Sequence, residues 1–325
     1  MRALLWLVAV GALLFGGYWF VGSRTLRSGV ETTLDALEFE GLARHGELSL
    51  TGFPARFDLT VTEPEWIGRD SVFGWRAPWI RIHALSYRPH HVIAVLPEEQ
   101  TLRIGREELT LATRDLSASA VFGLSPALPL ERAQTVGVAP VLTSPRGWGL
   151  SGTELRLAIR RGEGDLEHEV GAELIAPELT GAPVRLLGAG LPANGERLRL
   201  DAVFGLDEPL DRHILSRGIR IRSADIRALD LDWGTLELRG TGQIELDARG
   251  TPEGRIALSV RDWRAALDAA IGLGLVRDEI RPTLTRALEI LALTSGQPDD
   301  LSLPLTFHNG FMSLGPVPLG PAPHF

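Results

Sequence analysis

The side chains that could carry out chemistry in this chain are histidines, carboxylates and hydroxyls, because cysteine and lysine are both absent. The missing lysine amine excludes a P-loop, a Schiff-base enzyme and a pyridoxal-phosphate site. The missing thiol excludes thiol catalysis, Cys-ligated zinc, iron–sulfur clusters and disulfides. All 33 basic residues are arginine, against 41 acidic ones, and the net charge of −8 argues against a nucleic-acid partner. This residue usage resembles that of a GC-rich bacterial genome.

The remaining motifs fail the spacing that their chemistry needs. The eight histidines include no H-E-x-x-H pair, and His90 and His91 point to opposite faces of an extended chain. Residues 188–193 match G-x-G-x-x-A, but Pro192 and the strand pattern after it predict a loop where a dinucleotide site needs a helix. Ser125 precedes a proline and is not a nucleophile elbow. The sequence therefore predicts no catalytic, cofactor or metal-binding residue and no cofactor, and it favours a protein that is not an enzyme.

Alternation of apolar and polar residues dominates the chain from about residue 38 and predicts short strands. Turn signals such as Asn194-Gly195 and Pro252-Glu253-Gly254 separate the runs, so we expect a mainly β, elongated antiparallel meander with a rolled or groove-forming sheet. The clearest alternating runs are 57–61, 80–84, 116–122, 155–159, 170–174, 198–204, 236–238, 244–246 and 256–260.

Strict alternation gives each strand one apolar face. The sheet must therefore roll up on itself, stack on a second sheet or leave this face open. Arginine pairs such as Arg197 and Arg199 would occupy the solvated face. If the apolar face stays open, it forms a groove, and we name tentative groove positions on two strands. These are Phe57, Leu59, Val61, Leu200 and Phe204.

The N-terminus predicts a membrane anchor. No charged side chain occurs from Ala3 to Ser23, a run long enough to cross a bilayer, and it ends in the aromatic cluster of residues 18–20. We expect a transmembrane anchor over 1–23 and a helical stalk over 24–37, with cleavage of the anchor as the open alternative. Basic residues flank the run on both sides, but the absence of a second span favours a bacterial inner-membrane protein with its body in the periplasm.

The body is expected to be a single β-rich extracytoplasmic domain over 38–325 with one helical insertion. Asp262 is a plausible N-cap, and the apolar spacing that follows predicts a helix pair over about 262–294. Asn309-Gly310 then predicts a tight hairpin turn between two strands near the end of the chain.

Several of these segments together resemble a known family, the domain of unknown function 2125 found in alphaproteobacteria. The resemblance rests on the single span, the strand 52–59, the Gly-punctuated meander ending in 260–263 and the closing segments 309–311 and 314–320. These motifs are structural and carry no catalytic residue. More remotely, an anchor followed by a long β-meander is similar to the AsmA-like envelope proteins, and that resemblance implies apolar grooves linked to lipid movement.

Three functions fit this organisation. The first is a periplasmic lipid-binding or lipid-transfer module whose β groove shelters acyl chains. The second is a structural or scaffolding envelope protein with a filled core and a protein partner. The third, remote alternative is an envelope hydrolase with a site built from distant carboxylates and histidines. The expected partners are thus the membrane and a lipid or an envelope protein.

Overall fold

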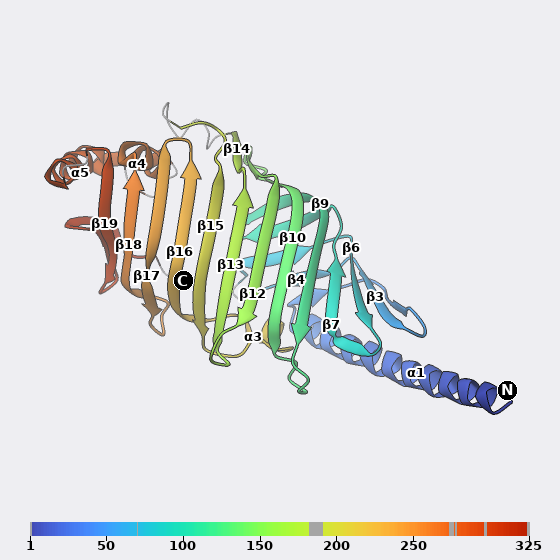
Figure 1. Ribbon diagram of the computed structural model, residues 1–325. Coiled ribbons are helices and arrows are strands. Elements are labelled where there is room, and N and C mark those ends of the chain that lie inside the picture. The colour runs from blue at the N-terminus through green and yellow to red at the C-terminus, as the bar shows by residue number, and fades with distance from the viewer. Residues whose placement is uncertain are drawn as a thin grey trace. The chain divides into compact units, whose positions relative to one another are not determined.

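The computed structural model describes residues 2–69, 71–181, 191–272, 276, 278–295 and 298–323. The protein is mainly β, as the alternation predicted, and its strands pair antiparallel (Figure 1). The chain forms two compact units, Met1–Thr135 with Leu210–Gly218, and Val136–Pro209 with Ile219–Phe325. The single domain expected over residues 38–325 stays a prediction.

The first unit contains one long helix and a set of strands. Strand β9 joins two groups of strands, since its N-terminal half pairs with β8 and its C-terminal half with β7. One group runs β7–β6–β3–β2 and the other β8–β5–β4–β1. The elements are α1 (Arg2–Phe39), β1 (Ala43–Arg44), β2 (Leu48–Thr51), β3 (Arg56–Thr62), β4 (Glu65–Ile67), β5 (Phe73–Arg76), β6 (Trp79–Leu85), β7 (Arg88–Val95), β8 (Glu99–Ile104), β9 (Glu107–Phe122) and α3 (Ile214–Arg217).

Helix α1 supplies the core of this unit. Its apolar stripe, including Val30 and Leu34, packs on the buried side chains of Leu48, Leu59 and Val61. The helix is continuous from the predicted anchor through the predicted stalk. Within the helical residues that the structure describes, no stretch is both long and apolar enough to cross a membrane.

The second unit is a meander. From β12 each strand pairs with the next described strand of the sheet in the order β12–β13–β15–β16–β17–β18–β19–β20–β21, while β14 pairs with β11. Strand β10 (Leu130–Thr143) begins in the first unit and ends in the second. The strands are β11 (Trp148–Ser151), β12 (Glu154–Arg161), β13 (Glu167–Ile175), β14 (Glu178–Gly181), β15 (Arg197–Leu206), β16 (Ile221–Trp233), β17 (Leu236–Leu246), β18 (Pro252–Arg261), β19 (Asp300–His308), β20 (Phe311–Leu314) and β21 (Val317–Pro321).

Helices α4 (Trp263–Gly272) and α5 (Arg281–Ser295) lie between β18 and β19 in the chain, and Figure 1 shows them at one end of these strands. Their buried side chains form one cluster with Leu301 of β19. The indole of Trp263 is 2% exposed and donates a hydrogen bond to the carbonyl of Pro298 (3.0 Å). The helices therefore cover the sheet near β17 to β19, and Ala269 of α4 also shares a buried cluster with Trp233 of β16.

The predicted Asn-Gly hairpin is confirmed. Asn309 and Gly310 both have positive φ (51° and 77°), and His308 pairs directly with Phe311 across the two-residue loop. Such a turn follows the right-handed twist of its strands, which is why this dipeptide is a strong local signal.

Candidate functional site

One face of the second unit's sheet is apolar across most of its strands. Side chains directly opposite each other in an antiparallel pair point to the same face, so the observed register aligns apolar residues in rows across the sheet. One row is Leu155, Leu174, Leu198, Leu231, Leu238, Val260 and Leu301. The next is Leu157, Ala172, Leu200, Leu229, Gly240, Leu258 and Leu303. We call this surface the apolar face.

Protein covers the apolar face unevenly. At β18 and β19 it is packed beneath α4 and α5, and Leu198 and Leu231 pack beside Trp233. Among the described buried clusters, none includes Leu157, Leu200 or Leu229, and Leu157 is 42% exposed. On β12 to β16 the second row is therefore partly exposed to solvent at Leu157, Leu200 and Leu229, whereas Ala202 and His168, on the same face of β15 and β13, are 0% and 2% exposed.

The residues that the sequence proposed as groove positions fall into two places. Phe57, Leu59 and Val61 lie in the first unit with exposures of 4–6%, beneath α1. The Phe57 ring stacks on the Trp19 ring at 6.1 Å, and a Cβ at Gly22 would lie only 3.0 Å from it. The continuation of α1 thus packs on this side of the three residues.

The other two predicted positions lie on the apolar face of the second unit. Leu200 and Phe204 are both half-buried on β15, opposite Leu229 and Ala224 of β16. Leu200 and Phe204 thus lie in the second unit and the other three predicted residues in the first, a division that alternation along single strands does not show. Leu229 and Leu258 were missed for the same reason.

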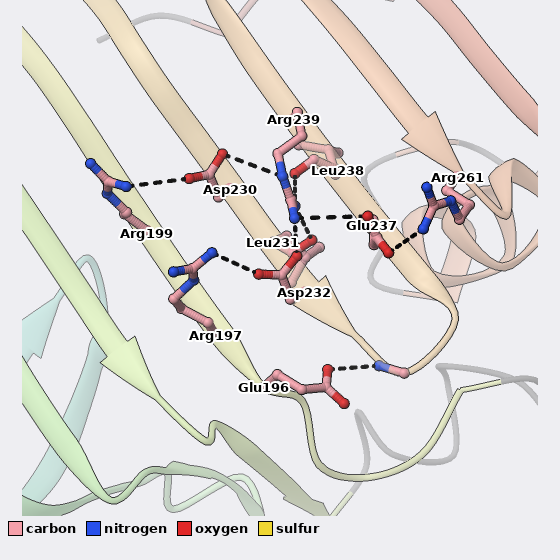
Figure 2. A network of polar contacts seen from close by, with 11 residues as sticks. Glu196, Arg197, Arg199, Asp230, Leu231, Asp232, Glu237, Leu238, Arg239 and Arg261 are labelled. Atoms are coloured by element: carbon pink, nitrogen blue, oxygen red, sulfur yellow. Dashed lines mark hydrogen bonds and ion pairs between the residues drawn. The ribbon is translucent and has the colours of Figure 1, made fainter.

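The opposite face of the same sheet carries alternating charges. One row reads Arg156, Glu173, Arg199, Asp230 and Arg239 across successive strands, so each cation faces carboxylates on its neighbours. Figure 2 shows the central part of this network on β15 to β18. We call this surface the charged face.

Asp230 and Asp232 are the centre of that network. Arg197 donates to Asp232 at 3.1 Å and Arg239 also donates to it, while Asp230 lies 3.9 Å from Arg199 and 3.7 Å from Arg239 (Figure 2). The two carboxylates are only 14–19% exposed, but the arginines are about 40% exposed. Each half-exposed pair contributes about 0–1 kcal/mol, so the network keeps this face polar more than it stabilises the fold.

His168 is the one deeply buried histidine among the described residues. It lies on β13 in register with Arg161 and Phe204, is 2% exposed, and its Nδ1 has no hydrogen-bond partner within the described chain. Burial lowers the pKa of His168 below its ordinary value of 6.5, and the nearby charge of Arg161 lowers it further, against a smaller opposing effect of a hydrogen bond with the Leu166 backbone. The imidazole is thus held neutral.

This neutral histidine predicts acid sensitivity. Because the pKa is lower in the folded than in the unfolded chain, the unfolded chain binds the proton first, and stability is lost as the pH falls below about 6.5 towards the folded value. We expect the urea-unfolding free energy to decrease from about pH 7.5 to about pH 5, and to decrease less in His168→Phe. The exposed His91→Phe is the control. An identical pH dependence in wild type and His168→Phe would contradict this assignment.

Residues 188–190 of the glycine motif lie outside the described residues, and Ala193 and Asn194 precede β15 in a loop.

The fold and its two contrasting faces define an antiparallel β protein whose sheet is apolar on one face and charged on the other. Residues 19–323 match the model of a family described as uncharacterised proteins conserved in bacteria, the domain of unknown function 2125. The chain belongs to this family, which confirms the resemblance seen in its motifs. No curated protein and no solved structure matches the chain.

Proposed function

We propose that this protein is a membrane-anchored periplasmic envelope protein that binds lipid acyl chains on the apolar face and transfers them or holds them there. The observation that carries the proposal is the partly exposed second row of that face on β12 to β16, where Leu157, Ala172, Leu200 and Leu229 lie side by side. The charged face on the other side of the same strands stays in water. The function is binding, and the proposal includes no catalytic step.

Acyl chains suit such a surface because they need contact area and no polar partner. Each buried CH₂ group contributes about 0.8 kcal/mol, so a chain lying along one row gains several kcal/mol without a specific hydrogen bond. The rows run across the strands, and the short side chain of Ala172 leaves the second row low between Leu157 and Leu200. An extended acyl chain fits this relief better than a bulky ring does.

The sequence of α1 supports the anchoring part of the proposal. The uncharged run from Ala3 to Ser23 ends in aromatic residues that prefer the interface between membrane and water. These aromatics are tied to the first unit: Tyr18 donates to the Ser86 carbonyl and Trp19 to the Arg56 carbonyl, each at 2.7 Å. On this proposal the part of the uncharged run before Tyr18 lies in the inner membrane, and the loops that contact Tyr18 and Trp19 lie at the periplasmic membrane surface.

Exposed aromatic residues in the same loops agree with that placement. Phe53, 63% exposed, meets the Trp19 ring edge-on at 5.2 Å, and Tyr87 is 62% exposed next to the buried Ser86. Aromatic side chains that are open to solvent beside the end of an apolar helix are typical of a protein surface in contact with lipid headgroups.

A protein partner is the second candidate. Val136, Val138 and Val141 of β10 are 37–41% exposed and give the second unit a further apolar strip. A strip of β-branched residues on a strand suits the surface of another folded protein. On this alternative the chain is a scaffold, and the apolar face is covered by its partner.

Native mass spectrometry of the full-length protein, released from detergent, tests the lipid proposal. We expect wild type to carry co-purified lipid. The variants Leu200→Glu and Leu229→Glu should lose it at least about tenfold, because placing a carboxylate against an acyl chain costs several kcal/mol. Thr241→Glu, an exposed position on the opposite face of β17, should retain it.

Near-ultraviolet circular dichroism establishes that each variant is folded. Folded variants that bind lipid as wild type does would refute binding at this face. Lipid absent from wild type, together with a protein that co-purifies with wild type and is lost in Leu200→Glu, would favour the scaffold.

A further inference from the structure

The chain turns back directly after α1, so the segment that follows the helix lies beside its last turns. Gly41 adopts φ +72°, its amide donates to the Glu38 carbonyl (2.9 Å), and the Leu42 amide donates to the Leu37 carbonyl (2.8 Å). These are the two hydrogen bonds of a Schellman motif, and the expected apolar contact is present because Leu37 and Leu42 pack together. The chain therefore reverses within four residues and runs back beside the helix as β1.

This reversal gathers three side chains that can bind a metal. Asp35 and Glu38 are three residues apart and share one face of α1, and His45 follows β1. One ligand atom from each of the three lies within 4.8 Å of the others. Atoms that share an ion at about 2.0–2.1 Å lie at most about 4 Å apart, so small rotations of the two exposed carboxylates would close the site.

The tautomer of the His45 imidazole suits metal binding. Its Nδ1 lies 2.8 Å from the Gly46 carbonyl oxygen, so Nδ1 carries the proton and donates it, and Nε2 is left with a lone pair. Nε2 is out of contact with solvent and has no hydrogen-bond partner among the described residues. A backbone carbonyl that fixes the tautomer is the usual support of a metal-binding histidine.

The electrostatics of the position also favour a cation. The C-terminal end of a helix carries partial negative charge, and α1 has no basic residue in its last turn. Glu40 pairs with Arg69, but within the part of the chain that the structure describes neither Asp35 nor Glu38 forms an ion pair. The two carboxylates add negative charge at this end of the helix, and no described cationic side chain neutralises it.

We propose that Asp35, Glu38 and His45 bind a divalent transition-metal cation such as Zn²⁺. One imidazole nitrogen and two carboxylate oxygens are typical zinc ligands, whereas Ca²⁺ and Mg²⁺ use oxygen ligands. Water completes the coordination. The ion fastens the end of α1 to the start of the β structure and neutralises the two carboxylates. The proposal does not depend on lipid binding.

Isothermal titration of the full-length, chelator-treated protein with Zn²⁺ tests the site. We expect one equivalent to bind and to raise the melting temperature, and Co²⁺ to give the visible absorption of a low-symmetry site. Asp35→Asn, Glu38→Gln and His45→Asn should each weaken binding at least about tenfold. Glu31→Gln, one turn earlier and paired with Arg27, and His91→Asn should bind as wild type does.

Asp35 and Glu38 are exposed, so their variants test the ligands without disturbing the core. Failure of wild type to bind Zn²⁺, or equal binding by wild type and all three variants, would overturn the proposal. Loss of binding in the two control variants as well would place the ion elsewhere and overturn it too.

Discussion

Leu59→Glu should destabilise the first unit by about 3–5 kcal/mol, because an unpaired carboxylate there would be buried. Leu59 is 6% exposed on β3, opposite Leu50 of β2, and shares a cluster with Val30 and Leu34 of α1. The negative charge would have no partner on that face. Hydrogen exchange measures the effect by region, and we expect amide protection to fall in β2, β3 and β6.

Thr60→Glu is the matched control for that substitution. Thr60 is the next residue of β3, points to the opposite face and pairs with Arg81 of β6, which can accept a carboxylate neighbour. We expect a change within about 0.5 kcal/mol. Equal protection in Leu59→Glu and wild type would mean that α1 does not pack on β3 in solution, and the space beneath it would again be open to a ligand.

Leu288→Ala should destabilise the second unit by about 2–5 kcal/mol. Leu288 is 3% exposed and lies one turn after Leu284 on the face of α5 that packs against Trp263 and Leu301. Removing its methyl groups leaves a cavity between helix and sheet, because Trp263 is held in place by its hydrogen bond to Pro298. Thermal unfolding followed by circular dichroism measures the loss.

Leu293→Ala removes the same atoms from the same helix at a position that is 73% exposed. We expect it to change stability by less than about 0.5 kcal/mol. If the two alanine variants were equally stable, α5 would not be docked on β19, and the apolar face would extend further than the structure places it.

The strands and the hairpin could be predicted because their signals are local. Alternation with period two marks a strand wherever it occurs, and Asn309-Gly310 fixes a turn through the positive φ of two residues. The pairing of β3 with β6 and of β13 with β15 could not be predicted, since it depends on which apolar faces meet in space.

The candidate site shows the same limit. Leu200 was identified because it alternates along its own strand, but Leu229 became its neighbour only through the register of β15 with β16. The cluster of Asp35, Glu38 and His45 had one sequence signal, a glycine directly after the stripe of α1, which marks a helix end. That signal does not place His45 beside the two carboxylates, because the direction in which the chain leaves the helix is not encoded in it. The pairing of carboxylates with Arg197 and Arg239 likewise could not be predicted without the register of β15, β16 and β17.

The continuity of α1 has a consequence for how this chain can vary in evolution. The helix runs for 38 residues without a break, with Trp19 beside Phe57 near its middle and Leu34 in the core further on. Each inserted residue turns everything beyond it by about 100°. A single insertion between these two contacts would turn one of them away from the sheet. Substitutions along the exposed side of this helix are tolerable, but its length between the two contacts is fixed.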